Sequence, residues 1–251
     1  MKIFIAAPFG NYLKFQSYNN VIPVTGTWTL KNRGGFLKRI WKIAATLRYS
    51  FDNKGWINKL GLPNPGINTG IIKTSSNEIL SIGEIELGDF KKMSKLISTN
   101  QSLEINLSCP NLGLDKNLPW NDAKLFIDRK DSISSRNYFI AKISPLTTYD
   151  ELKLLIDEIG FKQIHCCNTL PVKEGGLSGQ TLKPYVKRLI NIIRKNWGNK
   201  IEIIAGGGVN SVEDVKDYIN SGADHISLGS VCFTPWKIHN ILGSFNMPVD
   251  K

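Results

Sequence analysis

Eight short runs of apolar and β-branched residues recur along this chain of 251 residues, and most of them end where Gly, Pro, Asn or Ser follows. Helical spacing falls between most of the runs, most clearly over 149–159, 182–195 and 211–221. Strands that alternate with helices are typical of parallel βα units. An α/β fold of the TIM (β/α)8 barrel type uses about 250 residues, so we expect one barrel domain over 1–251. The predicted strands are 3–7, 21–24, 79–82, 103–107, 139–143, 163–167, 201–205 and 225–228.

The link between the first two predicted strands is too short for a helix. A crossover with its helix usually takes at least ~10–12 residues, and the stretch from Phe9 to Val21 is interrupted by turn formers. These are Gly10, Asn11, Asn19 and Asn20. We therefore predict a barrel whose first β–α connection is shortened.

Composition narrows the class of protein. The net charge is +11, but the lysines are scattered along the chain, so we expect a solvated surface and no nucleic-acid partner. No run approaches the ~20 apolar residues that span a bilayer. The four cysteines (109, 166, 167 and 232) form no CxxC pair and the three histidines have no ligand spacing, so we expect neither a disulfide framework nor a metal site. These features favour a cytoplasmic protein.

One basic segment stands apart from the scattered charge. Residues 36–48 have apolar side chains at helical spacing and basic side chains on the opposite face. Such a helix can cover the barrel rim with its apolar face. It can also lie on a membrane surface or dock an electron acceptor, so a peripheral membrane location stays open.

Polar residues of unusual kinds stand where predicted strands end. Asn106, Cys109 and Asn111 follow the fourth strand, Lys142 lies in the fifth, and Asn168 follows the sixth. Chemistry in barrel enzymes is placed at these ends. An amide side chain offers one acceptor and two donor hydrogens, which matches the edge of a cyclic imide. A lysine there can neutralise charge that develops on a reduced flavin. On residue chemistry alone, Cys109 can be a base or a small buried hydrophobe.

Glycines follow the last two predicted strands. The run Gly206-Gly207-Gly208 precedes a helix that Ser211 is placed to cap, and Gly229-Ser230 ends the final strand. Glycine allows close backbone approach, and the N–H groups at a helix start attract phosphate. Loops after strands 7 and 8 are the usual phosphate site of such barrels. We therefore predict a phosphorylated cofactor here.

Taken together, these motifs resemble the dihydroorotate dehydrogenase family of flavin-dependent barrels, which oxidise dihydroorotate to orotate in pyrimidine synthesis. The resemblance extends from about residue 24 to residue 235. It is carried by the following stretches: Gly26-Thr27 with Thr29, 55–66, 106–111, Lys142, Asn168-Thr169, 175–179 with Lys183-Pro184, 206–208 and Gly229-Ser230.

The resemblance implies a role for each motif. Cys109 corresponds to the base that takes the C5 proton while hydride leaves C6 for FMN. The substrate-binding residues would be Asn58, Lys59, Leu60, Gly61, Leu62, Asn106, Asn111, Asn168 and Thr169. The FMN-binding residues would be Thr27, Asn106, Lys142, Gly179, Gly207, Gly208, Gly229 and Ser230.

Signatures of two family branches are mixed in this chain. A cysteine base resembles the soluble branch, whereas Gly26-Thr27 and the run 175–179 resemble the quinone-linked branch, whose base is serine. The electron acceptor therefore stays open among fumarate, quinone and NAD, and a homodimer is compatible with the sequence. The family has a further flavin-contacting lysine in the connection after strand 1, which only Lys14 could match here, and we expect no counterpart of the family's segment before strand 1.

Two other functions remain compatible with the sequence. One is a tRNA dihydrouridine synthase, which is also a flavin barrel with a loop cysteine. The other is a degenerate barrel that binds FMN or another phosphorylated ligand without catalysis, which the shortened first connection suggests.

Overall fold

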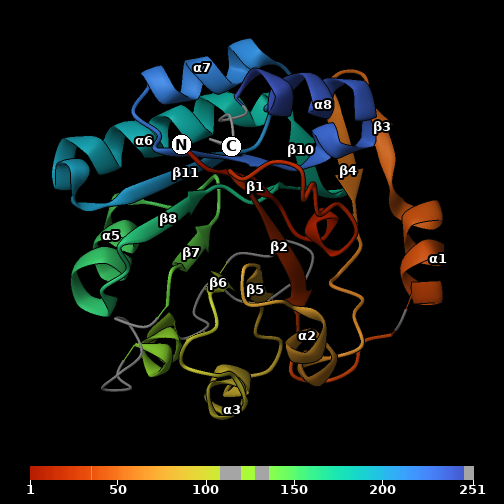
Figure 1. Cartoon of the computed structure of the whole chain (residues 1–251), viewed down its shortest axis with the longest axis vertical. Coiled ribbons are helices and arrows are strands. Elements are labelled where there is room, and N and C mark those ends of the chain that lie inside the picture. The colour runs from red at the N-terminus through yellow and green to blue at the C-terminus, as the bar shows by residue number, and fades with distance from the viewer. Residues whose placement is uncertain (35, 108–119, 128–135, 246–251) are drawn as a thin grey trace.

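In the computed structural model, eight parallel strands close into a barrel (Figure 1). The structure describes residues 1–34, 36–107, 120–127 and 136–245, and only the backbone at 36–39, 120 and 121. The barrel order is β1-β12-β11-β8-β7-β6-β5-β2. All eight predicted strands are confirmed, with ends shifted by a few residues. They are β1 Ile3–Ile5, β2 Val21–Trp28, β5 Ile79–Ile82, β6 Leu103–Asn106, β7 Phe139–Ile143, β8 Gln163–Cys166, β11 Glu202–Gly206 and β12 His225–Leu228.

Alternation along the strands separates two hydrophobic regions. Inward-facing side chains near the amino-terminal ends form a small closed cluster that fills the barrel floor, made of Phe4, Ile22, Val24, Ile79, Ile140 and Ile204. The neighbouring outward-facing residues pack against the helices in a much larger cluster that includes Ile3, Ile105 and Ile203. Because the strands are buried on both sides, they appear in the sequence as nearly continuous apolar runs.

The shortened first connection is confirmed. Between β1 and β2 the described chain forms a single 3-10 turn, η1 Phe9–Asn11, and no α-helix. Gly10 is required there, because a Cβ at this position would lie 2.3 Å from the carbonyl oxygen of Val24 in β2. The loop therefore packs directly on the barrel where a helix would otherwise stand.

A second, four-stranded sheet in the order β3-β4-β10-β9 was not predicted. It is formed by β3 Arg48–Ser50, β4 Gly55–Asn58, β9 Leu170–Val172 and β10 Gly175–Gly179. The predicted helix over 36–48 ends earlier than expected, as α1 Phe36–Thr46, because β3 begins at Arg48. Figure 1 shows α1 at the edge of the molecule beside β3 and β4.

The remaining helices cover the barrel. They are α2 Ile67–Lys73, α3 Asp89–Leu96, α5 Tyr149–Lys153 followed by the π-helical turn η4 Leu154–Ile159, α6 Lys183–Trp197, α7 Val212–Asn220 and α8 Pro235–Ser244. The 3-10 segments besides η1 are η3 Trp120–Phe126, η5 Gln180–Leu182, η6 Gly198–Lys200 and η7 Ser230–Phe233. The predicted cap is confirmed: the Ser211 hydroxyl accepts a hydrogen bond from the Asp214 N–H. No helix in the described ranges has the length and apolar character needed to cross a bilayer.

Candidate active site

A cavity of about 350 Å³ opens at the carboxyl-terminal ends of the barrel strands. Its wall combines residues that follow β1, β8, β11 and β12 with side chains of α1 and of the four-stranded sheet. Its size and its mixed apolar and polar lining suit a small-molecule or cofactor site. Predicted site residues that line it are Asn58, Leu60, Lys142, Asn168, Thr169, Gly207, Gly208, Gly229 and Ser230.

Two predicted amides are joined beside this cavity. The Asn168 amide nitrogen donates to the Asn106 side-chain oxygen over 3.1 Å, and the Asn106 amide nitrogen donates to the Thr27 hydroxyl over 3.2 Å. The Thr27 and Ser81 hydroxyls are 3.1 Å apart. These contacts fix the orientation of both amides. Asn168 lines the cavity, whereas Asn106 and Thr27 do not line it and instead hold Asn168 in place.

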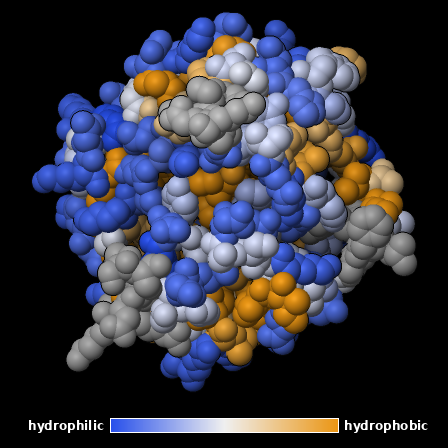
Figure 2. Space-filling model, viewed as in Figure 1, coloured by the Kyte–Doolittle hydropathy of each residue, from blue (hydrophilic) through white to orange (hydrophobic). Residues whose placement is uncertain are grey.

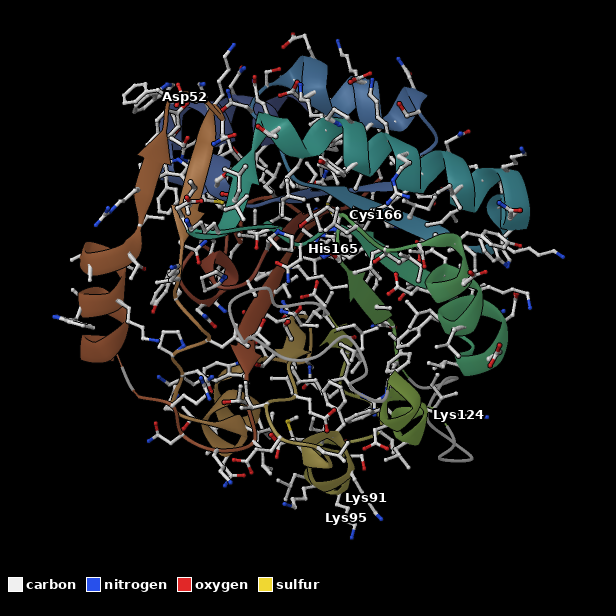
Figure 3. All side chains as sticks on the ribbon, turned by 180° about the vertical axis from the view of Figure 1, so that it is seen from behind. Asp52, Lys91, Lys95, Lys124, His165 and Cys166 are labelled. Atoms are coloured by element: carbon white, nitrogen blue, oxygen red, sulfur yellow. The ribbon has the colours of Figure 1, made fainter. Side chains whose placement is uncertain are left out.

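The hydrogen bonds continue from Ser81 to a buried acid. The Ser81 hydroxyl donates to Glu104 over 2.7 Å, and His165 Nδ1 donates to the other carboxylate oxygen over 2.7 Å. The Lys142 ammonium lies 3.7 Å from Glu104, and both side chains are more than nine-tenths buried. Figure 3 shows His165 deep inside the ribbon of the barrel, whereas Lys91, Lys95 and Lys124 lie at the periphery.

The environment fixes the charge states of this cluster. Burial by itself would raise the pKa of Glu104, but the Lys142 charge and the hydrogen bonds from His165 and Ser81 outweigh it and hold the pKa at about 2. Burial is the main cause that lowers the pKa of His165. Glu104 is therefore ionised and His165 neutral at pH 7, with the His165 proton on Nδ1.

The glycine loop after β11 has the backbone that a phosphate cradle needs. Gly207 and Gly208 have φ of 103° and 80°, a region that other residues rarely adopt. A Cβ on Gly208 would lie 2.9 Å from the Gly179 carbonyl oxygen. Gly179 does not line the cavity but supports this loop from behind. Gly229 and Ser230 approach from the end of β12.

The loop over 58–62 is held by two basic side chains. Lys42 of α1 donates to the Leu60 carbonyl over 2.9 Å, and Arg33 donates to the Gly61 carbonyl over 3.3 Å. Asn58 and Leu60 line the cavity, whereas Lys59, Gly61 and Leu62 do not. The helix α1 thus positions part of the cavity wall.

The remaining candidates named from the sequence are Cys109, Asn111 and Lys14. Cys109 and Asn111 fall outside the described residues, so their assignment stays a prediction. Lys14 forms an ion pair of 2.6 Å with Glu78, which directly precedes β5 at the opposite end of the barrel. Lys14 does not line the cavity.

Sequence reasoning missed three residues of the barrel interior. His165 and Ser227 line the cavity, and Glu104 lies beneath it. The Ser227 hydroxyl oxygen is buried with no hydrogen-bond partner in the described part of the chain. One sequence signal was available, because Glu104 and His165 each interrupt an otherwise apolar strand.

Fold and cavity together define a barrel of the class that usually binds phosphorylated ligands at the loops after its last two strands. The sequence model of dihydroorotate dehydrogenase matches residues 44–244. The chain belongs to the dihydroorotate dehydrogenase family, whose enzymes are FMN-dependent oxidoreductases that act on a CH–CH bond.

Curated relatives with two different acceptors match the chain. The dihydroorotate dehydrogenase B (NAD+) catalytic subunit of Endomicrobium trichonymphae is 31% identical over 235 residues, which cover 82% of this chain and 72% of the relative. The subunit of the same name from Thermotoga petrophila is 28% identical and covers 98% of this chain and 95% of the relative. A quinone-linked enzyme of Legionella pneumophila is 28% identical over 88% of this chain and 76% of the relative.

The fold is shared with a solved structure. The dihydroorotate dehydrogenase of Eimeria tenella in complex with ferulenol superposes with a TM-score of 0.73 at 17% identity. The match covers 97% of this chain and 80% of that one. This agreement extends over the whole barrel.

The residues present fit FMN. Lys142 donates no hydrogen bond to any described residue, so its ammonium hydrogens remain available to an acceptor in the cavity that it lines. The orphaned Ser227 hydroxyl offers a further polar contact there. Gly207, Gly208, Gly229 and Ser230 would hold the phosphate, and Lys142 would contact the flavin ring.

Proposed function

We propose that this protein oxidises dihydroorotate to orotate in pyrimidine synthesis, with Cys109 as the base that removes the C5 proton. The observation that carries the proposal is the hydrogen-bonded pair Asn168–Asn106 beside Lys142 at the cavity. FMN, when bound, accepts the hydride that leaves C6. A chain that spans 95% of one relative's length supports the further proposal that residues 1–251 act as one FMN-binding domain.

Residues of the chain itself would bind the substrate and remove its proton. Oriented amides can bind the two carbonyl groups and the N–H between them in a cyclic imide. Asn168 is held by Asn106 and also accepts a hydrogen bond of 2.9 Å from the Thr169 backbone N–H. A base must reach its proton at about 3 Å, so Cys109 would have to approach C5 on the open side of the ring.

Anaerobic mixing with dihydroorotate tests the proposal. The purified protein should be yellow, and one equivalent of dihydroorotate should bleach the flavin absorption within seconds. Dithionite should bleach the same sample and serves as the control for a reducible flavin. Bleaching by dithionite but not by dihydroorotate would leave an FMN protein with a different substrate.

We further propose that α1 and the aromatic side chains next to it bind an anionic lipid surface. Large apolar side chains are exposed here, on α1 and just after β3: Trp41 is 68% exposed and Phe51 84%. Figure 2 shows hydrophobic residues gathered on the right-hand side of the view, over the region of α1 and β4. Tryptophan and basic residues around one exposed helix are typical of interfacial membrane binding.

Charge supports a lipid partner over a second copy of this basic chain. Between residues 30 and 60 the sequence holds eight basic residues and one acid, Asp52. One of the bases, Lys31, is paired with Glu86 at 2.6 Å, so the remaining bases still outnumber the acid. Each basic residue near an anionic membrane contributes about 1 kcal/mol of attraction. The surface is therefore complementary to phosphatidylserine-type headgroups.

This surface continues into the cavity wall. An aromatic row runs from Phe51 through Tyr49, Trp56 and Phe233 to Phe9, with neighbouring ring centroids 5.0–5.3 Å apart. Its last three members line the cavity. A lipid-bound protein would thus present its cofactor to a quinone dissolved in the bilayer, which makes quinone the acceptor we propose. A homodimer stays a prediction.

Sedimentation with vesicles of phosphatidylcholine and 30% phosphatidylserine tests this surface. Trp41→Glu should weaken vesicle binding at least tenfold, whereas Leu96→Glu, at a 49% exposed site at the end of α3, should not. The reduced enzyme should then be reoxidised by a short-chain quinone faster than by NAD+ or fumarate. Equal binding by both variants, or capture by a protein subunit with no vesicle binding, would refute the lipid assignment.

A further inference from the structure

The polar layer of the barrel interior holds a charge that the proposed function does not use. Above the apolar floor lie Ser81, Glu104, Lys142, His165 and Ser227, contributed by five different strands. Lys142 and His165 face each other in the register of β7 and β8. In the register of β6 and β7, Glu104 lies opposite Ile140, which is one step below Lys142 along the strands, and Glu104 does not line the cavity.

We propose that Glu104 is a positioning residue that holds Lys142 and offsets its charge, and so sets how strongly the site stabilises reduced FMN. The inference rests on FMN as cofactor and does not require dihydroorotate as substrate. Removing the carboxylate would leave the ammonium uncompensated beside the flavin.

Geometry supports a fixed carboxylate. Each oxygen of Glu104 accepts one hydrogen bond of 2.7 Å, from Ser81 and from His165, so the group cannot rotate freely. His165 is itself confined, because its Nε2 atom faces Gly206 so closely that a Cβ there would lie 2.8 Å away. Glu104 therefore has one orientation, and Lys142 lies 3.7 Å from it.

The distance between Lys142 and Glu104 lets the lysine pair with the carboxylate and still donate hydrogen bonds to the flavin. At 3.7 Å the ammonium is paired electrostatically with Glu104 but donates no hydrogen bond to it. Its hydrogens can thus be directed to the flavin, while the carboxylate behind it cancels part of the field. In a buried site of low dielectric constant, such a charge acts strongly on any group that gains an electron pair nearby.

The sign of the effect follows from charge alone. Two-electron reduction places negative charge on the flavin, and a neighbouring carboxylate opposes that change while the ammonium favours it. Glu104→Gln keeps the size of the side chain and removes the opposing charge. Reduced FMN should become relatively more stable, and the reduction potential should rise.

Equilibrium reduction of the FMN-loaded protein against a reference dye measures this effect without any substrate. We expect Glu104→Gln to raise the equilibrium constant for two-electron reduction about tenfold, which is ~30 mV. Ser81→Ala is the matched control, because it removes a hydrogen bond to the same carboxylate and keeps the charge. Glu104→Asp, which restores the charge, should return the potential toward that of the wild type.

If Glu104→Gln does not fold because the Lys142 ammonium is left unpaired, a second comparison removes that ammonium as well. In a Lys142→Gln background, adding Glu104→Gln should again raise the potential, because it removes the remaining negative charge. A shift no larger than that of Ser81→Ala in either comparison overturns the inference. If the shift is found but dihydroorotate fails to bleach the flavin, the inference stands and the proposed substrate falls.

Discussion

Replacing Cys109 by alanine is expected to slow the reduction of the flavin by dihydroorotate by about 10²–10⁴-fold, the range that a positioned base contributes. FMN content should remain equal to that of the wild type, because the predicted phosphate and ring contacts come from other residues. Stopped-flow absorption under anaerobic conditions measures the rate, and the flavin-to-protein ratio measures the cofactor.

Two variants make this result specific. Cys109→Ser should retain more activity than Cys109→Ala, because a hydroxyl can still transfer a proton. Cys232→Ala is the matched control: the Cys232 thiol donates to the Leu228 carbonyl, does not line the cavity, and has a pKa that burial raises to about 12. Flavin reduction at the wild-type rate in Cys109→Ala would show that another group removes the proton.

The barrel could be predicted from the sequence because its strands are buried on both faces. Each one is a short apolar run, such as Leu103–Asn106 or Phe139–Ile143, set apart by polar turns. The four-stranded sheet gave no such signal. Its central pair joins β4 to the glycine-rich β10, with Gly176 opposite Asn58, 118 residues apart. Two strands so far apart in the sequence, formed by residues of low strand propensity, leave no local sequence pattern from which their pairing could be predicted.

Only the candidate site residues at the ends of the barrel strands could be predicted from the sequence. Lys142, Asn168 and the glycines of 207–208 could be named because they follow or end strands, where a barrel exposes them. The layer beneath could not, since a buried acid becomes interpretable only when its partners are known. Glu104, Ser81 and His165 come from three strands, and their contacts depend on barrel register. For the basic helix α1, the sequence predicted the pattern of basic and apolar side chains but did not predict that the apolar side chains would be exposed.

Glu104 also carries the largest predicted effect on stability. Glu104→Leu would leave the Lys142 ammonium buried without its counter-charge and would leave Ser81 and His165 without their acceptor. Breaking a buried ion pair from one side costs about 3–5 kcal/mol. We expect the free energy of unfolding of the FMN-free protein in urea to fall by that amount at pH 7.

Acid should narrow this difference between wild type and Glu104→Leu. The pKa of Glu104 is lowered from its ordinary value near 4.5 to about 2 in the folded protein. The carboxylate therefore stabilises the fold fully above about pH 4.5, and this contribution is lost as the pH falls toward 2. The gap in unfolding free energy should be constant from pH 7 to 5 and shrink below pH 4.5.

Adding Lys142→Met to Glu104→Leu separates lost pairing from lost packing. The double variant buries no charge, so it should recover most of the stability lost in Glu104→Leu, as expected when a buried pair is replaced by apolar side chains of similar volume. If the double variant is no more stable than Glu104→Leu, or if the gap does not change with pH, then the ion pair does not stabilise the barrel. Recovery without a pH effect would mean that the pKa of Glu104 is the same in the folded and the unfolded protein, so that its carboxylate gains no stabilisation from Lys142.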